Sequence, residues 1–209
     1  MKHLEFRPNP YPGLLVTFCG LDGSGKSTLL RRLAAELEGK RPVLVTKQPT
    51  DAVRRADGFR AYMDTPAPDV FDYRAVSLQA AGDRLQHGRA VIEPALREGK
   101  VVLCDRYFYS CLANLRARGY TGDRWIYEIA ESVLRPDIAF FCDVPVELAV
   151  ARVRQRPEER CRYIDLPLQY KLRSAFLNIC VSNGGILLST AGPEETCFAA
   201  VKREWERRS

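Results

Sequence analysis

The residues Gly20-Leu-Asp-Gly-Ser-Gly-Lys-Ser27 form the most informative chemical pattern in the chain. They match G-x-x-x-x-G-K-[ST], a loop that cradles nucleotide phosphates. Its glycines let the backbone turn tightly and bring N–H groups close to phosphate oxygens. Lys26 has the charge to neutralise β- and γ-phosphate oxygens, and the Ser27 hydroxyl is a suitable ligand for Mg²⁺. The pattern therefore predicts a site for a nucleoside triphosphate and a magnesium ion.

The sequence on either side of this loop separates the motif from a chance match. Residues 14–19 form a short apolar run typical of a buried strand, and apolar residues follow at 29, 30, 33, 34 and 37 with helical spacing. A strand, a glycine turn and a helix are the context that the motif requires. The predicted phosphate-binding set is Gly20, Leu21, Asp22, Gly23, Ser24, Gly25, Lys26, Ser27 and Thr28.

A second apolar run, 101–104, ends in Asp105 and Arg106. An aspartate at such a strand end holds Mg²⁺ or its water shell in P-loop proteins, so Asp105 and Ser27 are the predicted metal ligands. Asp105 could also cap a helix over 107–118, which is compatible with the metal role. Arg106 cannot take a proton from water but can clamp a phosphate through two hydrogen bonds. This favours phosphoryl transfer to an acceptor over hydrolysis, and the Asn-Lys-x-Asp motif of GTPases is absent.

Strand-like and helical patterns alternate along the chain. Strands are predicted at 14–19, 43–46, 101–104, 138–142 and 186–189, and helices at 25–38, 72–98, 107–118, 123–134, 145–155, 166–182 and 193–207. Such alternation predicts a single α/β domain over 1–209, with a parallel sheet covered by helices on both faces. Pro94 should kink or interrupt the second helix. We expect a substrate-side loop at 48–71 and a lid at about 152–164, although both could be plain surface connections.

Composition narrows the class of protein. The chain has 209 residues and a net charge of +6, and it has no apolar run near the ~18 residues that a membrane span needs. The seven cysteines form no C-x-x-C, and Cys19, Cys104 and Cys142 lie in or beside strand-like runs, so we expect a reduced, cytoplasmic protein without zinc. The arginines are spread along the chain, which favours phosphate chemistry over nucleic-acid binding.

From about residue 14 to 182 the chain resembles the thymidylate kinase family of P-loop nucleoside monophosphate kinases. The resemblance rests on pieces in a fixed order: the phosphate loop from Phe18 to Thr28, then Thr46-Lys-Gln-Pro-Thr50, Ala81-Gly-Asp-Arg-Leu-Gln-His87 with Ile92-Glu-Pro-Ala-Leu-Arg-Glu-Gly99, Asp105-Arg-Tyr with Ser110, and Arg135-Pro-Asp137 with Asp143-Val-Pro145. It implies a P-loop NTPase fold with strand order 2-3-1-4-5, ATP and Mg²⁺ as cofactors, and a homodimer.

The resemblance also implies roles for individual residues. Asp22 would contact the acceptor sugar, Arg106 the acceptor phosphate and Arg84 the acceptor base. One form of the family carries its catalytic arginine in the phosphate loop and the other carries it in the lid. Gly23 follows Asp22 here, so the chain resembles the lid form, and its lid offers Arg152, Arg154, Arg156 and Arg160. The predicted catalytic set is Lys26, Asp22, Arg106 and one of Arg156 and Arg160.

The acceptor pocket departs from the family pattern. Ala80 stands where the family often stacks its base on Phe, Asn114 and Leu115 stand where it often has Tyr-Gln, and Lys47 replaces an arginine that holds phosphate. The predicted acceptor-binding set is Asp22, Lys47, Ala80, Arg84, Arg106, Ser110, Asn114 and Leu115. We therefore expect ATP-dependent phosphorylation of a nucleoside monophosphate, with dTMP first. A kinase of another nucleotide, nucleoside or small acceptor, and a nucleotide-binding protein without catalysis, remain alternatives.

Overall fold

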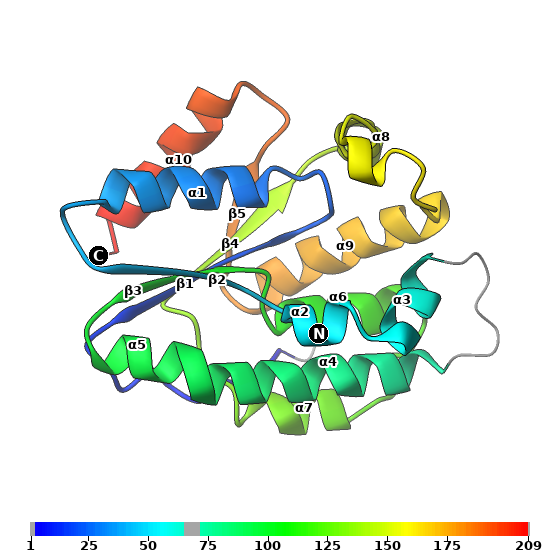
Figure 1. Ribbon diagram of the computed structural model, residues 1–209, viewed down its shortest axis with the longest axis horizontal. Coiled ribbons are helices and arrows are strands. Elements are labelled where there is room, and N and C mark those ends of the chain that lie inside the picture. Colours follow the sequence, from blue (N-terminus) through cyan, green and yellow to red (C-terminus); the bar gives the residue numbers. More distant parts are fainter. Residues whose placement is uncertain (1–2, 65–71, 209) are drawn as a thin grey trace.

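The computed structural model describes residues 3–64 and 72–208 (Figure 1). Its sheet consists of strands β1 (Leu14–Gly20), β2 (Val43–Lys47), β3 (Val101–Asp105), β4 (Ile138–Asp143) and β5 (Ile186–Ser189). The strands lie in the order β2-β3-β1-β4-β5, and every pair of neighbours is parallel. The predicted five-stranded parallel sheet and its order are confirmed.

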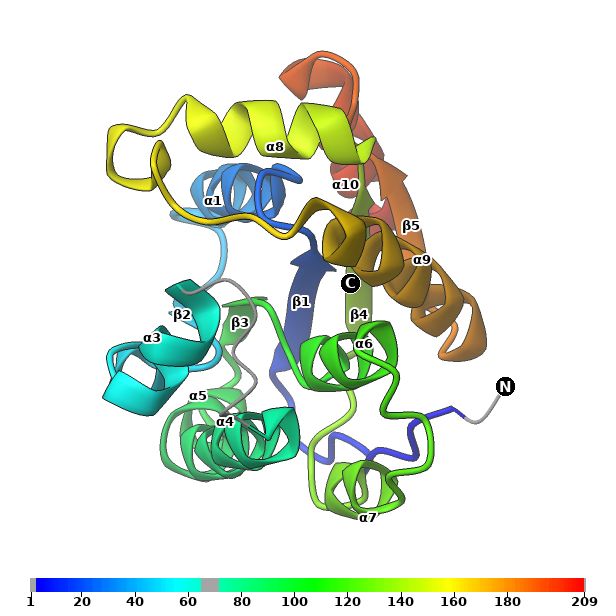
Figure 2. The ribbon, with the colours of Figure 1, turned by 90° about the vertical axis from the view of Figure 1, so that its right-hand side faces the viewer.

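Helices cover both faces of this sheet (Figures 1 and 2). Helices α1 (Lys26–Leu37) and α10 (Glu194–Glu206) pack on one face, and α4 (Tyr73–His87), α5 (Glu93–Arg97), α6 (Tyr109–Ala117) and α9 (Leu166–Ser182) pack on the other. The remaining helical segments are α2 (Asp51–Arg54), α3 (Asp57–Asp64), η1 (Gly88–Ile92), α7 (Trp125–Ala130), α8 (Val146–Arg154) and η2 (Pro157–Glu159). No helix in the described ranges combines the length and apolar character that crossing a bilayer requires.

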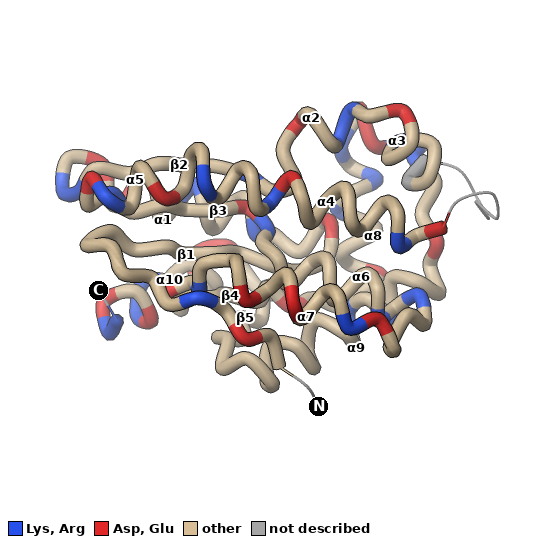
Figure 3. Tube along the Cα trace, turned by 90° about the horizontal axis from the view of Figure 1, so that it is seen from below, with Lys and Arg blue, Asp and Glu red and all other residues tan. Residues whose placement is uncertain are grey.

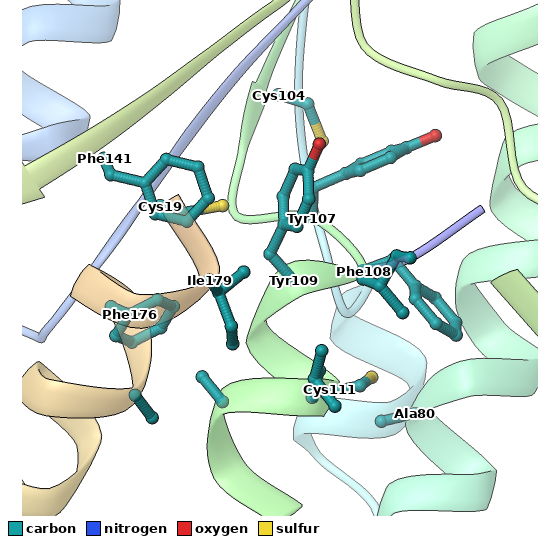
Figure 4. Close-up of a cluster of buried hydrophobic side chains, with 14 of the residues drawn as sticks. Cys19, Ala80, Cys104, Tyr107, Phe108, Tyr109, Cys111, Phe141, Phe176 and Ile179 are labelled. Carbon is teal, nitrogen blue, oxygen red and sulfur yellow. The ribbon is translucent and has the colours of Figure 1, made fainter. Parts of the chain in front are cut away.

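Side-chain alternation along the strands builds two hydrophobic cores. On β1, Val16 and Phe18 pack with α1 and α10, whereas Leu15 and Cys19 pack with α4, α6 and α9. This period of two is what a strand buried on both faces requires. Figure 4 shows part of the second core, in which Cys104 and Phe141 from the strands meet α6 and α9. Cys19, Cys104 and Cys142 are all buried, as predicted.

The predicted loop at 48–71 is wrong over its first part. Two short helices, α2 and α3, occupy residues 51–54 and 57–64, while residues 65–71 lie outside the described part of the chain. The backbone N–H of Thr50 donates to the Asp83 carboxylate on α4 at 2.7 Å, which anchors the start of α2. Helices of one or two turns give too short a periodic signal to be found from sequence. The helix predicted at 123–134 is likewise shorter, ending as α7 at residue 130.

Pro94 interrupts its helix, as predicted. The π-helical turn η1 lies directly before it, and the Glu93 N–H donates to the carbonyl of Gly88, five residues back. Proline has no N–H, and its ring would collide with the carbonyl four residues earlier in a regular α-helix. The wider π turn removes this conflict. It interrupts the regular α-helical hydrogen bonding between α4 and α5, although the chain stays helical throughout.

Parallel strands bring all their carboxyl ends to one edge of the sheet. This edge carries Gly20 at the end of β1, Gln48 after β2, Arg106 after β3 and Asp143 at the end of β4. Ligands of open α/β sheets bind outside this edge, so the topology gathers the predicted site residues there. Basic and acidic positions are interspersed along the whole trace (Figure 3), for example over α2 and α3.

Candidate active site

The phosphate loop joins β1 to α1. Gly25 adopts a left-handed conformation directly before α1, and Lys26 is the first residue of that helix. The Lys26 side chain is buried and its Nζ donates to the Leu21 carbonyl at 3.1 Å, so it curls back over the loop. The first amides of a helix have no intrahelical acceptor and carry partial positive charge. Loop, lysine and helix end therefore present donors and positive charge at one place, as phosphate binding requires.

Gly23 packs tightly against α8. Its φ angle is +80°, and a Cβ atom added there would lie 2.1 Å from the Ala149 carbonyl oxygen. Since no side chain fits, the loop has no room for an arginine at this position. The phosphate loop therefore supplies no arginine at the position that follows Asp22.

Asp105 and Ser27 meet at the end of β3. The Ser27 hydroxyl donates to Oδ2 of Asp105, whereas Oδ1 of Asp105 is buried without a hydrogen-bond partner in the described part of the chain. An orphaned carboxylate oxygen beside a hydroxyl fits Mg²⁺, which takes few protein ligands and keeps waters and phosphates. Asp105 does not cap α6, because that helix begins at Tyr109 with Phe108 at its N-cap.

Arg106 occupies a strained backbone position, with φ at 68°. Its N–H donates to the Phe18 carbonyl at 2.8 Å, so the turn after β3 is tied to β1. Its guanidinium donates to the Gly20 carbonyl at 3.0 Å and to the Asp22 carboxylate. Left-handed non-glycine residues occur where surrounding structure over-determines them, often at functional sites. This turn directs Arg106 toward the phosphate loop.

Asp22 is the charge centre of the site. Its carboxylate contacts Arg106, lies 3.6 Å from Lys26 Nζ, and accepts from Arg162 at 3.1 Å. Burial alone would raise the pKa of Asp22, but the charges of Arg106, Lys26 and Arg162 hold it well below its usual range. Burial and the neighbouring Arg106 lower the pKa of Lys26. One carboxylate therefore offsets only part of the charge of three cations, and the place expected for phosphates stays positively charged.

The structure distributes the lid arginines unequally. Arg152 donates to the Thr190 carbonyl, and Arg154 donates to the carbonyls of Arg160 and Arg162. Arg156 pairs with Glu159 at 2.9 Å, and Arg160 is exposed. Arg162 alone among the lid arginines reaches Asp22, and it also contacts Glu159 at 3.0 Å. The sequence analysis did not name Arg162 among the lid arginines. Its place at the end of the predicted lid, shortly before the helix predicted at 166–182, could have identified it as a candidate.

A cavity of about 420 Å³ opens beside Asp22, between α4, α6 and α9. Seven predicted residues line it: Leu21, Asp22, Ala80, Arg84, Arg106, Ser110 and Asn114. Lys47 is instead exposed at the end of β2, and Leu115 is fully buried in the core. The helical period explains Leu115, because it lies one position beyond Asn114 and points away from the cavity.

Arg54 lines the cavity and was not predicted, because residues 48–71 read as a loop. Its Nε donates to the Pro49 carbonyl at 3.0 Å, which holds the side chain along the cavity wall. Burial and the nearby charge of Arg106 lower the pKa of Arg54. Two guanidiniums that repel each other at the mouth of a cavity form a site for a doubly charged anion.

The chain matches the family model described as thymidylate kinase over residues 18–199. It is 38% identical over 170 residues to a probable thymidylate kinase of Pyrococcus horikoshii, covering 80% of this chain and 82% of the relative. It is 34% identical over 196 residues to the thymidylate kinase of Cereibacter sphaeroides, covering 88% and 90%. The chain belongs to the thymidylate kinase family. The prediction of an enzyme of the nucleoside monophosphate kinase class is thereby confirmed.

Thymidylate kinase family membership explains why the phosphate loop, Arg106 and the cavity lie together. It does not explain Ala80, which lines the cavity with a side chain that has no ring to stack on a base. Aromatic lining comes instead from other elements: Phe59 and Tyr62 on α3, Tyr73 at the start of α4, Tyr163 in the lid and Phe176 on α9. The phosphate loop and Arg106 match the resemblance found in the sequence, whereas Lys47 and the cavity residue Ala80 depart from it.

Proposed function

We propose that the chain transfers the γ-phosphoryl group of ATP to the phosphate of a nucleoside monophosphate, with dTMP as the acceptor and dTDP as the product. The observation that carries this proposal is the position of Arg106. Its guanidinium contacts both the phosphate loop, at Gly20, and Asp22, and it lines the acceptor cavity. One residue thus joins the donor site to the acceptor site, as direct transfer between two anions requires.

The transfer needs no covalent intermediate. An oxygen of the acceptor phosphate forms a bond to Pγ while the bond between Pγ and the β,γ-bridging oxygen breaks, leaving ADP. Lys26 and the loop amides would neutralise the donor phosphates, and Arg54 and Arg106 would hold the acceptor phosphate. Catalysis then consists of alignment and charge neutralisation.

Ser27 and Asp105 are the proposed Mg²⁺ ligands, supported by the unpartnered Asp105 Oδ1. When bound, the ion would supply positive charge that offsets the charge of the nucleotide phosphates. The chain's own contribution is to fix the carboxylate: the Ser27 hydroxyl and the buried end of β3 hold it in place.

Among the lid arginines, Arg162 is the one that we propose contacts the transferred phosphoryl group. Its contact with Asp22 places it between the phosphate loop and the acceptor cavity. Binding of both nucleotides would offer it stronger anions than the shared Asp22 carboxylate. A guanidinium that arrives on closure stabilises the transition state and excludes water. The candidates favoured by the sequence, Arg156 and Arg160, precede Arg162 in the lid; Arg156 pairs with Glu159, and Arg160 is exposed.

An acceptor panel tests the proposed function. We expect ADP release with dTMP to exceed ADP release with CMP, AMP, thymidine or water, measured by a coupled assay with ATP and Mg²⁺. A kinase of another acceptor is favoured specifically by Ala80 and Asn114, and it would show its largest rate with a different member of the panel. Tight ATP binding without transfer to any acceptor would instead identify a binding protein.

We also propose that the enzyme acts in the cytoplasm as a homodimer. Six of the seven cysteines are buried free thiols in the described chain, which suits a reducing compartment. Leu78 on α4 is an exposed apolar side chain, and pairing of two copies through α4 would cover it. Light scattering of the purified protein, with Leu78→Lys as the disrupting variant, tests the dimer.

A further inference from the structure

Arg54, a proposed contact of the acceptor phosphate, ends a helix of a single turn. Helix α2 spans Asp51–Arg54, and a helix this short is not stable by itself in water. The Arg54 N–H donates to the Thr50 carbonyl at 3.0 Å, and the Arg54 Nε donates to the Pro49 carbonyl at 3.0 Å. The backbone and the side chain of Arg54 are thus both fixed to the two residues before α2. Its place in the cavity depends on what holds those residues.

The carboxylate of Asp83 on α4 holds Thr50 through two hydrogen bonds. The Thr50 N–H donates to Oδ2 of Asp83 at 2.7 Å, and the Thr50 hydroxyl donates to Oδ1. Hydrogen bonds to a carboxylate are roughly twice as strong as those between neutral groups. Thr50 occupies the N-cap position of α2, but within the described residues its hydroxyl makes no cap hydrogen bond to that helix. The threonine side chain therefore docks α2 onto α4 and does not cap it.

The Arg54 side chain belongs to the phosphate end of the acceptor cavity. It lines the cavity together with Asp22 and Arg106. Burial and then the charge of Arg106 lower the pKa of Arg54, whereas the charge of Asp22 raises it, so its guanidinium lies within electrostatic reach of both groups. Arg54 therefore gives the cavity a positive charge that Lys47, exposed at the end of β2, does not supply.

Helix α4 connects this phosphate contact to the base end of the cavity. Asp83 directly precedes Arg84, which lines the cavity and which the family resemblance places at the acceptor base. One turn later, His87 contacts Thr46 Oγ1 at 2.8 Å and Gln48 Nε2 at 3.0 Å. The segment after β2 is thus attached to α4 at three points, and α4 itself carries Arg84. The separation between the phosphate contact and the base contact is therefore set by one helix.

We propose that Asp83 is a positioning residue: through Thr50 it holds Arg54 at the place of the acceptor phosphate, in register with Arg84. Asp83 acts through Arg54 and not by contact with a substrate. The inference rests on the proposed function, to which it adds the residue that sets the acceptor phosphate contact. Loss of the Asp83 carboxylate should therefore weaken the hold on the acceptor phosphate and leave the hold on the nucleoside unchanged.

Calorimetric titrations of the full chain with dTMP and with thymidine test this proposal. Thymidine has no phosphate, so displacement of Arg54 should affect the binding of dTMP only. We expect Asp83→Ala to raise the Kd for dTMP about 10-fold, the order of magnitude for one lost contact to a charged group. The Kd for thymidine should change by less than about twofold. Partial loss of folded protein lowers the fitted stoichiometry and leaves the Kd unchanged, so it cannot imitate this result.

Two further variants separate positioning from a general loss of structure. Asp83→Asn should keep the Kd for dTMP within about threefold of the wild type, because the amide can accept from the Thr50 N–H and donate to the Thr50 hydroxyl oxygen. Asp51→Asn is the matched control and should alter neither Kd, since Asp51 is an exposed carboxylate of α2 that pairs with Arg55.

A double-mutant cycle tests whether Asp83 acts through Arg54. Arg54→Ala should raise the Kd for dTMP at least as much as Asp83→Ala does. Adding Asp83→Ala to Arg54→Ala should then raise it by less than about twofold more, because residues that act as one unit are not additive.

Three outcomes would overturn the proposal while the wild type still phosphorylates dTMP: an unchanged Kd for dTMP in Asp83→Ala, an equal rise for dTMP and thymidine, or full additivity with Arg54→Ala. A wild type that neither binds nor phosphorylates dTMP would instead refute the proposed function, and this inference would fail with it.

Discussion

The two ends of the active site differ in whether their charged and polar groups have partners within the protein. At the phosphate end, Lys26, Arg106 and Arg162 share the Asp22 carboxylate as an internal partner before any ligand binds. At the base end, Arg84 Nε and Ser110 Oγ are buried without a hydrogen-bond partner in the described part of the chain. The phosphate end can exchange an internal carboxylate for substrate phosphates, whereas the base end can be satisfied only by a ligand that matches it. We therefore expect catalysis to depend on the first end and selectivity on the second.

Lys26→Met gives the largest expected effect, because it removes the buried ammonium of the phosphate loop. We expect kcat to fall by about 1,000-fold or more in an ADP-release assay. The thermal unfolding midpoint should change by only a few degrees. Lys40→Met is the matched control, since Lys40 is exposed beyond α1 and pairs with Glu36. Retained turnover in Lys26→Met would refute the mechanism.

The lid arginines provide the second test of the phosphate end. Arg162→Ala should lower kcat by about 100-fold, because the lid guanidinium that contacts Asp22 is lost. Arg156→Ala and Arg160→Ala should each change kcat by less than about threefold. If kcat falls more for Arg156→Ala or Arg160→Ala than for Arg162→Ala, the catalytic lid arginine is Arg156 or Arg160, as the sequence predicted.

Arg84→Lys tests the base end. The substitution keeps the charge but removes the planar fork and its Nε donor. We expect KM for the acceptor to rise about 10-fold while kcat at saturation changes little, since the lost contact binds substrate and transition state alike. If kcat falls instead and KM stays constant, the division between a catalytic end and a selective end is wrong.

Asp22→Asn has the smallest expected effect and a distinctive pH dependence. The pKa of Asp22 lies well below 3.8 in the folded state, so its charge stabilises the fold fully above about pH 3.8, and this stabilisation is lost as the pH falls through the folded-state pKa. About a third of the side chain is exposed, toward the cavity, so water screens the ion pairs. We expect Asp22→Asn to lower the free energy of unfolding by about 1 kcal/mol at pH 7.

Denaturant titrations from pH 7 down to the lowest pH at which the wild type stays folded would measure this difference. The gap between Asp22→Asn and wild type should narrow at the acid end of that range. A gap that is independent of pH, or a variant as stable as the wild type at pH 7, would show that the three cations do not need this carboxylate.

Short-range patterns predicted the framework well. The run 14–19, the glycine loop and the helix after it appear as β1, the loop and α1, and the sheet order is as predicted. Asp105 and Arg106 were predicted as site residues because they follow a parallel strand, and the carboxyl ends of parallel strands lie at one edge of the sheet. The segments 51–54 and 57–64 were missed, and Arg54 with them, because one or two helical turns carry little periodic signal.

The sequence by itself determined the chemistry of the phosphate loop and the alternation of strands and helices, because both depend on residue types at short spacings. The order of the strands came from the resemblance to the family. Only the tertiary structure decided which lid arginine meets Asp22, why Gly23 admits no side chain, and that Arg84 and Ser110 line one cavity. These facts depend on how α4, α6, α8 and the lid pack in space. Packing joins residues far apart in the chain, and no local spacing specifies it.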